Sequence, residues 1–265
     1  MYNLIKSHNY TLRRDMLSVI TLITVFVLPY ILICFSGPLE GVSFADMTAS
    51  KYMLIIGATI PEIFLFAVMI FTAKAVGGDG GDKTINYELM SGHSRDKVYW
   101  SRIITGFVWG ILIVFIASLI PYAVITLING WGDNLDKTEL FVRLGLTIFP
   151  TIRIAAIFML ITSLVGSAGG GMAISYGIVM IETILDAVLD EIDLFDSTCV
   201  LGISNINKLL TYNNSWEFVE NGKAITWFDY TTSNDLIVKT IIVSLIMAVI
   251  YVSIGYFVFK KRDKS

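Results

Sequence analysis

The chain has 265 residues, of which 55% are hydrophobic and only 15% carry a charge. Soluble domains carry about 25% charged residues, and the charges here lie in short islands between long apolar runs. This pattern excludes an ordinary soluble domain and indicates an integral membrane protein. The formal net charge of −3 excludes nothing further, because the placement of charge matters more than its sum in a membrane protein.

The first apolar run follows Lys6, Arg13 and Arg14, as the h-region of a signal peptide follows its basic n-region. It has no charge from Met16 to Leu39, which is longer than the roughly 7–15 residues of an h-region. We therefore expect an uncleaved first membrane span.

Six apolar runs are long enough to form membrane helices, since about 20 residues cross a hydrocarbon core of about 30 Å. We expect an all-α membrane protein with a single transmembrane domain over residues 1–265. The expected spans cover residues 16–36, 52–76, 103–128, 144–165, 172–189 and 236–259. Glycine-rich residues 166–171 divide the fourth span from the fifth, so we expect a helical hairpin with a very short turn there.

The basic residues predict the orientation of the chain. Twelve of the nineteen Lys and Arg residues lie in the N-terminal tail, in the loop between the second and third spans, or in the C-terminal tail. Cytoplasmic loops are enriched in these residues. We expect both termini and this loop in the cytoplasm, and the long acidic segment of about 190–235, between the fifth and sixth spans, outside the cell.

The loop between the second and third spans is the most informative soluble segment. Asp82 is suited to cap a short helix on which Ile85, Leu89 and Met90 form an apolar stripe. Ser94 is suited to cap the next helix. Two interpretations of the short helix remain open: it rests on lipid, or it docks a cytoplasmic partner.

This loop resembles that of the permease subunits of bacterial ATP-binding-cassette (ABC) transporters of the type-2 exporter class. The resemblance rests on residues 82–85 and 89–95, with Arg102 where lysine is usual, and on the layout of tail, six spans and long outer loop. The chain departs from the family over 79–82, where members often have Glu before Gly-Thr.

The resemblance implies a coupling helix that docks a separate ABC ATPase, and a second permease subunit, identical or different. The docking residues would be Asp82, Thr84, Ile85, Leu89, Met90, Ser94 and Arg95. The chain lacks a G-x-x-x-x-G-K-[ST] loop, so we expect no enzyme activity and no cofactor in it, with ATP and Mg²⁺ bound by the partner ATPase. The other expected partner is membrane lipid, and we expect no nucleic acid.

The family resemblance also implies a location and a range of substrates. We expect the bacterial plasma membrane, and export of antimicrobial peptides, as in bacteriocin export or immunity, or of lipids or drugs. The acidic outer segment favours a cationic, amphipathic peptide.

Three ionisable residues fall inside expected spans at a similar depth of about 15 Å: Glu62, Arg153 and Glu182. Charges inside a membrane face protein or water, so we expect an intramembrane cluster. Three interpretations remain open: a structural ion pair, part of a lateral cavity or coupling network, and independent snorkelling.

Asp186 and Asp190 follow Glu182 at i+4 and i+8 and form an outer acidic stripe on one helix face. This stripe is either a receptor for a cationic peptide or a solvated helix end. Carboxylates alone at this spacing are weak evidence for a metal, and Cys34 and Cys199 form no ligand cluster, so we expect no metal site.

Other functions remain as alternatives. The chain has no nucleophile–base motif, and its only histidines are His8 and His93. The Glu182/Asp186 pair leaves open an intramembrane hydrolase. An energy-independent channel or a structural membrane subunit is the other alternative.

Overall fold

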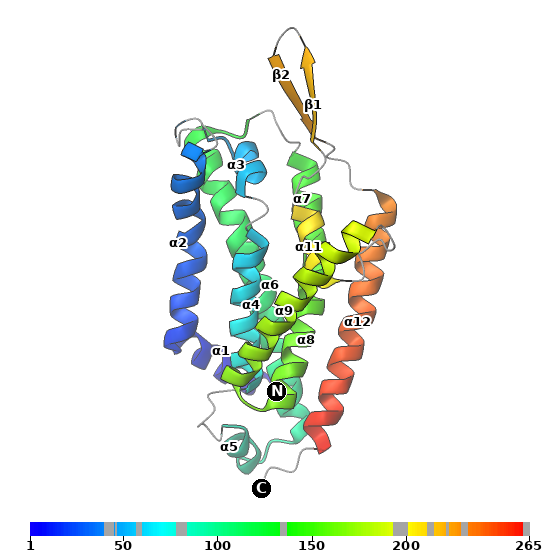
Figure 1. The fold of residues 1–265 in the computed structure, drawn as a ribbon. Coiled ribbons are helices and arrows are strands. Elements are labelled where there is room, and N and C mark those ends of the chain that lie inside the picture. The colour runs from blue at the N-terminus through cyan, green and yellow to red at the C-terminus, as the bar shows by residue number, and fades with distance from the viewer. Residues whose placement is uncertain are drawn as a thin grey trace.

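The computed structural model describes residues 1–39, 45, 47–56, 60–77, 84–132, 137–192, 201–210, 215–220, 223–228 and 233–261. This part of the chain is predominantly helical, as expected (Figure 1). The helices are α1 (Tyr2–Arg14), α2 (Met16–Leu39), α3 (Ala49–Ile56), α4 (Ile60–Gly77), α5 (Thr84–Met90), α6 (Arg95–Asn129), α7 (Lys137–Leu146), α8 (Ile148–Val165), α9 (Ala168–Ile192), α11 (Gly202–Leu210) and α12 (Asn234–Lys261). Strands β1 (Ser215–Glu220) and β2 (Lys223–Phe228) pair antiparallel, with Ser215 opposite Phe228.

The long helices form an elongated bundle (Figure 1). Helix α8 contacts α4, α6, α9, α11 and α12 and is the centre of the packing. Helix α1, helix α5 and the last turn of α12 lie at one end of the bundle, and α3 and the β-hairpin lie at the other. The three basic regions of the sequence therefore meet at one end.

Four segments of the described residues are long and apolar enough to cross a membrane: Arg95–Asn129, Lys137–Val165, Ala168–Leu185 and Asn234–Lys261. The bent pair of Tyr2–Arg14 and Met16–Leu32 is a fifth candidate. Large apolar side chains are exposed along α2, α9 and α12, as contact with lipid requires. The segment Ile63–Gly77 is apolar but shorter, so the count of six spans stays a prediction.

The structure describes the second expected span in two parts. Helix α3 ends at Ile56 and α4 begins at Ile60, and residues 57–59 lie outside the described residues. A continuous helix over 52–76 therefore stays a prediction. Pro61 lies in the first turn of α4 as it is described, a position at which proline is tolerated.

The turn between α8 and α9 is shorter than the six residues expected. Helix α8 ends at Val165, and Gly166 follows in the left-handed conformation with φ +80°. Helix α9 begins at Ala168, so the following glycines 169–171 are helical. Close packing of α9 against α8 explains why position 171 is a glycine, because a Cβ there would collide with Thr162 of α8.

The segment between α9 and α12 contains structure that we did not predict. The hairpin is a departure from an all-α fold, and its sequence signal is the alternation of aromatic and β-branched residues over 215–220 and 223–228 on either side of Asn221-Gly222. Helix α11 had a signal as well, since Ile203, Ile206 and Leu210 recur at helical spacing.

Candidate functional site

Helix α5 lies at the end of the bundle that also holds α1 and the last turn of α12 (Figure 1). It ends in a turn at Gly92, whose φ of +86° favours glycine. The Ser91 hydroxyl donates to the Glu88 carbonyl at 2.7 Å. The Ser94 hydroxyl then accepts from the Lys97 N–H at 3.4 Å, which confirms Ser94 as the N-cap of α6. Only residues 91–94 separate the two helices.

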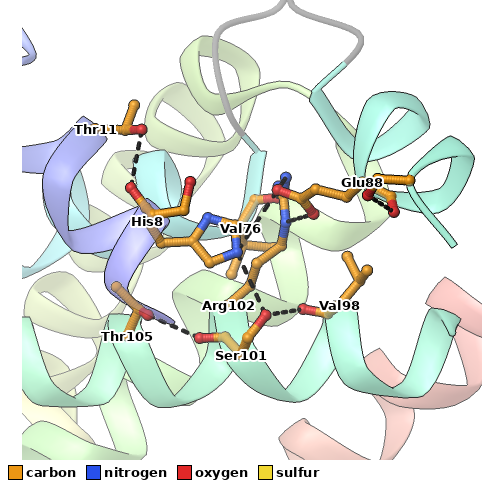
Figure 2. A network of polar contacts seen from close by, with 10 residues as sticks. His8, Thr11, Val76, Glu88, Val98, Ser101, Arg102 and Thr105 are labelled. Carbon is orange, nitrogen blue, oxygen red and sulfur yellow. Dashed lines mark hydrogen bonds and ion pairs between the residues drawn. The ribbon is translucent and has the colours of Figure 1, made fainter. Parts of the chain in front are cut away.

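The inner face of α5 is fixed by an ion pair (Figure 2). Arg102 of α6 donates to both oxygens of Glu88, from Nη2 to Oε1 at 3.0 Å and from Nε to Oε2 at 3.3 Å. Its Nη1 donates to the Val76 carbonyl of α4 at 2.8 Å, and Arg102 is only 3% exposed. Next to Glu88, Leu89 packs against the core. One guanidinium therefore ties α4, α5 and α6 together.

Helix α1 reaches the same network through His8 (Figure 2). The His8 Nε2 atom lies 3.6 Å from Glu88 Oε1 and 3.3 Å from the Ser101 hydroxyl. Burial, and next the charge of Arg102, lower the pKa of His8 to about 4, and the carboxylate of Glu88 offsets this only in part. The imidazole is neutral at neutral pH, so Arg102 is the cation that neutralises Glu88.

The outer face of α5 carries two exposed, largely apolar side chains. Tyr87 is 69% exposed and Met90 is 82% exposed, and their i, i+3 spacing places them on one side of the helix. The predicted apolar stripe of Ile85, Leu89 and Met90 is wrong for Met90, which does not share a side with Leu89. Adjacent helical residues are about 100° apart, so Leu89 points into the core while Met90 points away from it.

The remaining predicted docking residues have different surroundings. Asp82 lies outside the described residues, as do the side chains of Thr84 and Ile85. Arg95 is half-buried and donates from Nη1 to the Lys260 carbonyl in the last turn of α12 at 3.1 Å. Carbonyls at a helix C-terminus have no intrahelical donor, so the guanidinium stabilises this end of α12.

A second contact joins the start of α6 to α12. The Tyr256 hydroxyl of α12 donates to Asp96 Oδ1 at 2.8 Å, and the Tyr99 hydroxyl of α6 donates to the Val252 carbonyl at 2.6 Å. The rings of Tyr99 and Tyr256 also pack edge to face, with centroids 5.5 Å apart. The first turns of α6 are therefore bonded to α5 on one side and to α12 on the other.

Two members of the predicted intramembrane cluster lie at the first turn of α11. Glu182 Oε2 accepts from the Ile203 N–H at 3.2 Å, a favourable place for a carboxylate because the helix dipole is positive there. Arg153 is 6% exposed, and its Cδ lies 3.8 Å from the Cβ position of Gly202. The side chain of Glu62 is outside the described residues, so the three-residue cluster stays a prediction.

The predicted acidic stripe is helical in its backbone, because α9 continues to Ile192. The side chains of Asp186 and Asp190 are outside the described residues. Both interpretations of the stripe stay predictions.

Helix α11 is buried among α4, α7, α8 and α9, and sequence reasoning missed it. The Asn205 amide donates to the Thr240 hydroxyl of α12 at 3.0 Å, and both residues are almost fully buried. Buried polar groups need partners, so this bond fixes the position of α11 against α12.

The profile of a protein family described as ABC-2 family transporter protein matches residues 35–264. The chain belongs to the ABC-2 transporter family. The match begins near the end of α2 and extends past the end of α12. No curated protein matches the sequence.

As an ABC-2 transporter, the chain is a multi-pass membrane protein and a permease subunit of an ABC transporter, with an ABC ATPase as its partner. The predicted family is thereby confirmed. An ABC-2 permease is a transport subunit in the membrane, which agrees with the absence of an ATP-binding motif in the sequence. Bacteriocin or antimicrobial-peptide transport and pairing with a second permease stay predictions.

Proposed function

We propose that this permease belongs to an ATP-driven exporter and that α5 is the helix on which its ATPase docks. One observation carries the proposal: α5 exposes Tyr87 and Met90 while Glu88 and Leu89 hold its other face to the bundle.

The outer face of α5 has the composition of a protein-binding surface. Tyr and Met are enriched at protein interfaces, and Tyr is among the residues that contribute most to binding. Met adapts its shape to a partner because its side chain is flexible and polarizable. Tyr87 and Met90 would enter a pocket of the ATPase as adjacent anchors.

The inner face supports transmission of movement. Glu88 binds Arg102 of α6, and Arg102 also binds the Val76 carbonyl of α4. Moving α5 alone would separate these buried partners, which costs free energy because each charge would lose its counter-ion. ATPase movement at α5 would therefore displace α4 and α6 with it.

Charge supports a cytoplasmic location for this end of the bundle. Both α1 and the last turn of α12 are basic, with Arg13, Arg14, Lys260 and Lys261 in their final turns. Such residues accumulate on the cytoplasmic side of membrane proteins, where ATP is hydrolysed. The hairpin β1–β2, at the other end, would then lie outside the cell.

We further propose that two permease subunits pair and that the exported substrate is a cationic, amphipathic peptide. The acidic character of residues 190–235, including Asp190, supports a cationic substrate by charge complementarity. Lipids and drugs are the other candidate substrates of the same exporter.

The experiment has two stages. The chain is purified from its native membrane under mild detergent, and ATPase subunits that co-purify are identified by mass spectrometry. The recovery of that ATPase is then compared for wild type, Tyr87→Ser/Met90→Ser and the control Tyr2→Ser, which removes a tyrosine that is 78% exposed on α1.

We expect the double substitution to lower ATPase recovery at least tenfold, since two anchors together contribute more than about 1.4 kcal/mol. The control should match wild type. Wild-type recovery from Tyr87→Ser/Met90→Ser would exclude α5 as the docking helix. Substrate transport that persists without any ATPase would falsify the ATP-driven mechanism.

A further inference from the structure

Helix α1 has two faces of different chemistry. Leu4 and Leu12 are buried in the core, and His8 between them contacts the α5–α6 network. Asn9 accepts from the Trp109 Nε1 of α6 at 2.7 Å. One side of α1 is therefore attached to the protein along its whole length.

The opposite side of α1 is exposed, basic and aromatic. Tyr2, Lys6 and Tyr10 follow at i, i+4 and i+8, and Arg14 continues the same side by one more turn. Arg13 lies at the edge of this side, where its guanidinium is 5.9 Å from the centroid of the Trp109 ring of α6. All five residues are exposed. The Arg14 guanidinium lies 4.4 Å from the centroid of the Tyr10 ring. We call these five residues the basic face of α1.

The basic face carries an uncompensated positive charge. Residues 1–14 contain three basic side chains but no Asp or Glu. The next residue, Asp15, is paired with Lys74 of α4 at 2.9 Å. Burial opposes ionisation of Asp15, but the bonds from Lys74 and Ser18 outweigh it and lower its pKa. Asp15 therefore does not neutralise the face.

The bend at Asp15 turns α1 away from the direction of α2. Helices α1 and α2 differ in direction by 69°, and α1 lies across the end of the bundle (Figure 1). Asp15 holds the bend, because its Oδ2 accepts from the Ser18 N–H at 2.9 Å and so caps α2. A helix at this angle to a membrane-crossing helix runs close to the membrane plane.

We propose that the basic face of α1 binds the headgroups of anionic phospholipids. Tyrosine side chains favour the membrane–water interface, and Lys and Arg beside them are attracted to anionic headgroups. These residues follow one another along one side of the helix, which suits a row of headgroups. This inference does not depend on α5 being the docking helix.

The test measures which lipid lies beside α1. A Cys34→Ser/Cys199→Ser background receives a single cysteine by Asn3→Cys, labelled with a fluorophore. The protein is placed in vesicles of equal amounts of phosphatidylcholine and phosphatidylglycerol, with only one of the two lipids brominated. The ratio of quenching by brominated phosphatidylglycerol to quenching by brominated phosphatidylcholine reports the enrichment of the anionic lipid.

We expect a ratio of at least three, since one Lys or Arg at an anionic surface favours binding about fivefold. Lys6→Gln/Arg13→Gln/Arg14→Gln should lower the ratio to about one, and Lys6→Gln alone should lower it in part. The matched control Lys97→Gln/Lys260→Gln/Lys261→Gln removes the same charge from the same end of the bundle but not from α1, and should keep the wild-type ratio.

Two results would overturn the proposal. One is a wild-type quenching ratio near one, which would mean that the anionic lipid is not enriched beside α1. If adding the ATPase then lowers the quenching by both lipids, the basic face binds a protein instead. The other is an equal fall of the ratio in the α1 variant and in the matched control, which would indicate a general effect of surface charge.

Discussion

The guanidinium of Arg102 binds both carboxylate oxygens of Glu88, at 3.0 and 3.3 Å, across the joint between α5 and α6. The two residues are 14 positions apart, and the turn at Gly92 lies between them. Because Arg102 also holds the Val76 carbonyl, it stabilises the end of α4 as well. This side chain is the mechanical link between the proposed docking helix and the membrane bundle.

Removing Arg102 should destabilise the protein more than removing the whole ion pair. Arg102→Gln leaves Glu88 largely buried without its cation, and we expect a loss of about 3 kcal/mol in the free energy of unfolding. Arg102→Gln/Glu88→Gln should lose at least about 1 kcal/mol less, because it leaves no unpaired charge. Unfolding of the purified protein in detergent measures both.

An exposed ion pair provides the control for this cycle. Lys239 and Asp235 of α12 are paired but 46% and 69% exposed in their side chains. Asp235→Asn should change the stability by less than about 1 kcal/mol. Equal losses for Arg102→Gln and for the double variant would show that the pair does not act as a unit.

Acid should weaken the attachment of α1 through His8. The pKa of His8 is lowered from 6.5 to about 4 in the folded protein, so the unfolded chain binds this proton first as the pH falls. Stability is therefore unaffected above about pH 6.5 and declines between pH 6.5 and 4, by at most about 3 kcal/mol. Apparent melting temperatures measured from pH 7.5 to 4.5 test this.

His8→Gln removes the titrating group but keeps a polar side chain at the position. The decline between pH 6.5 and 4 should be smaller in this variant than in wild type. His93→Gln is the matched control, because His93 is the other histidine and lies in the turn after α5. A wild-type pH profile in His8→Gln would contradict the assignment.

Gly77→Ala should separate α4 from the α8–α9 hairpin. A Cβ on Gly77 would lie 2.6 Å from the Ala168 nitrogen and 2.7 Å from Thr162 Cγ2. The contact with backbone is not relieved by a rotamer change, so we expect a loss of about 1–3 kcal/mol. Gly169→Ala is the control, because Gly169 is also helical and a Cβ there would meet open space. This substitution should be neutral or should stabilise the protein by up to about 1 kcal/mol.

Asn205→Leu should release α11 from α12. The substitution leaves the Thr240 hydroxyl without its amide partner, and we expect a loss of about 1–3 kcal/mol. The double variant Asn205→Leu/Thr240→Val should lose less free energy of unfolding than the two single variants lose in sum. A cysteine placed at Ile206, which is fully buried, should react faster with a membrane-impermeant thiol reagent in Asn205→Leu.

Ser204 offers a matched control on the same helix. Its hydroxyl is buried and has no hydrogen-bond partner within the described residues. Ser204→Ala should therefore be neutral or stabilising by about 1 kcal/mol, with an unchanged rate at position 206. If the cysteine at position 206 reacts faster in both Asn205→Leu and Ser204→Ala, the effect is not specific to the bond between Asn205 and Thr240.

Several parts of the fold followed from local sequence signals. Long uncharged runs predicted the membrane helices, and the Ser94 cap predicted the start of α6 within one residue. The β-hairpin and α11 had readable patterns, but the acidic composition of the segment obscured them.

The amino-acid sequence was enough to predict that this protein is membrane-embedded, that its three basic regions share one side, and that a short helix precedes α6. These properties depend on composition and on spacing within a few turns, which a single chain segment displays. The packing of the helices was needed to show that Leu89 faces inward while Met90 faces outward, and that Glu88 contacts Arg102 and His8. Such pairings depend on how separate helices pack. The helix propensities of Leu89 and Met90 are similar, so they do not indicate which of the two residues faces the bundle.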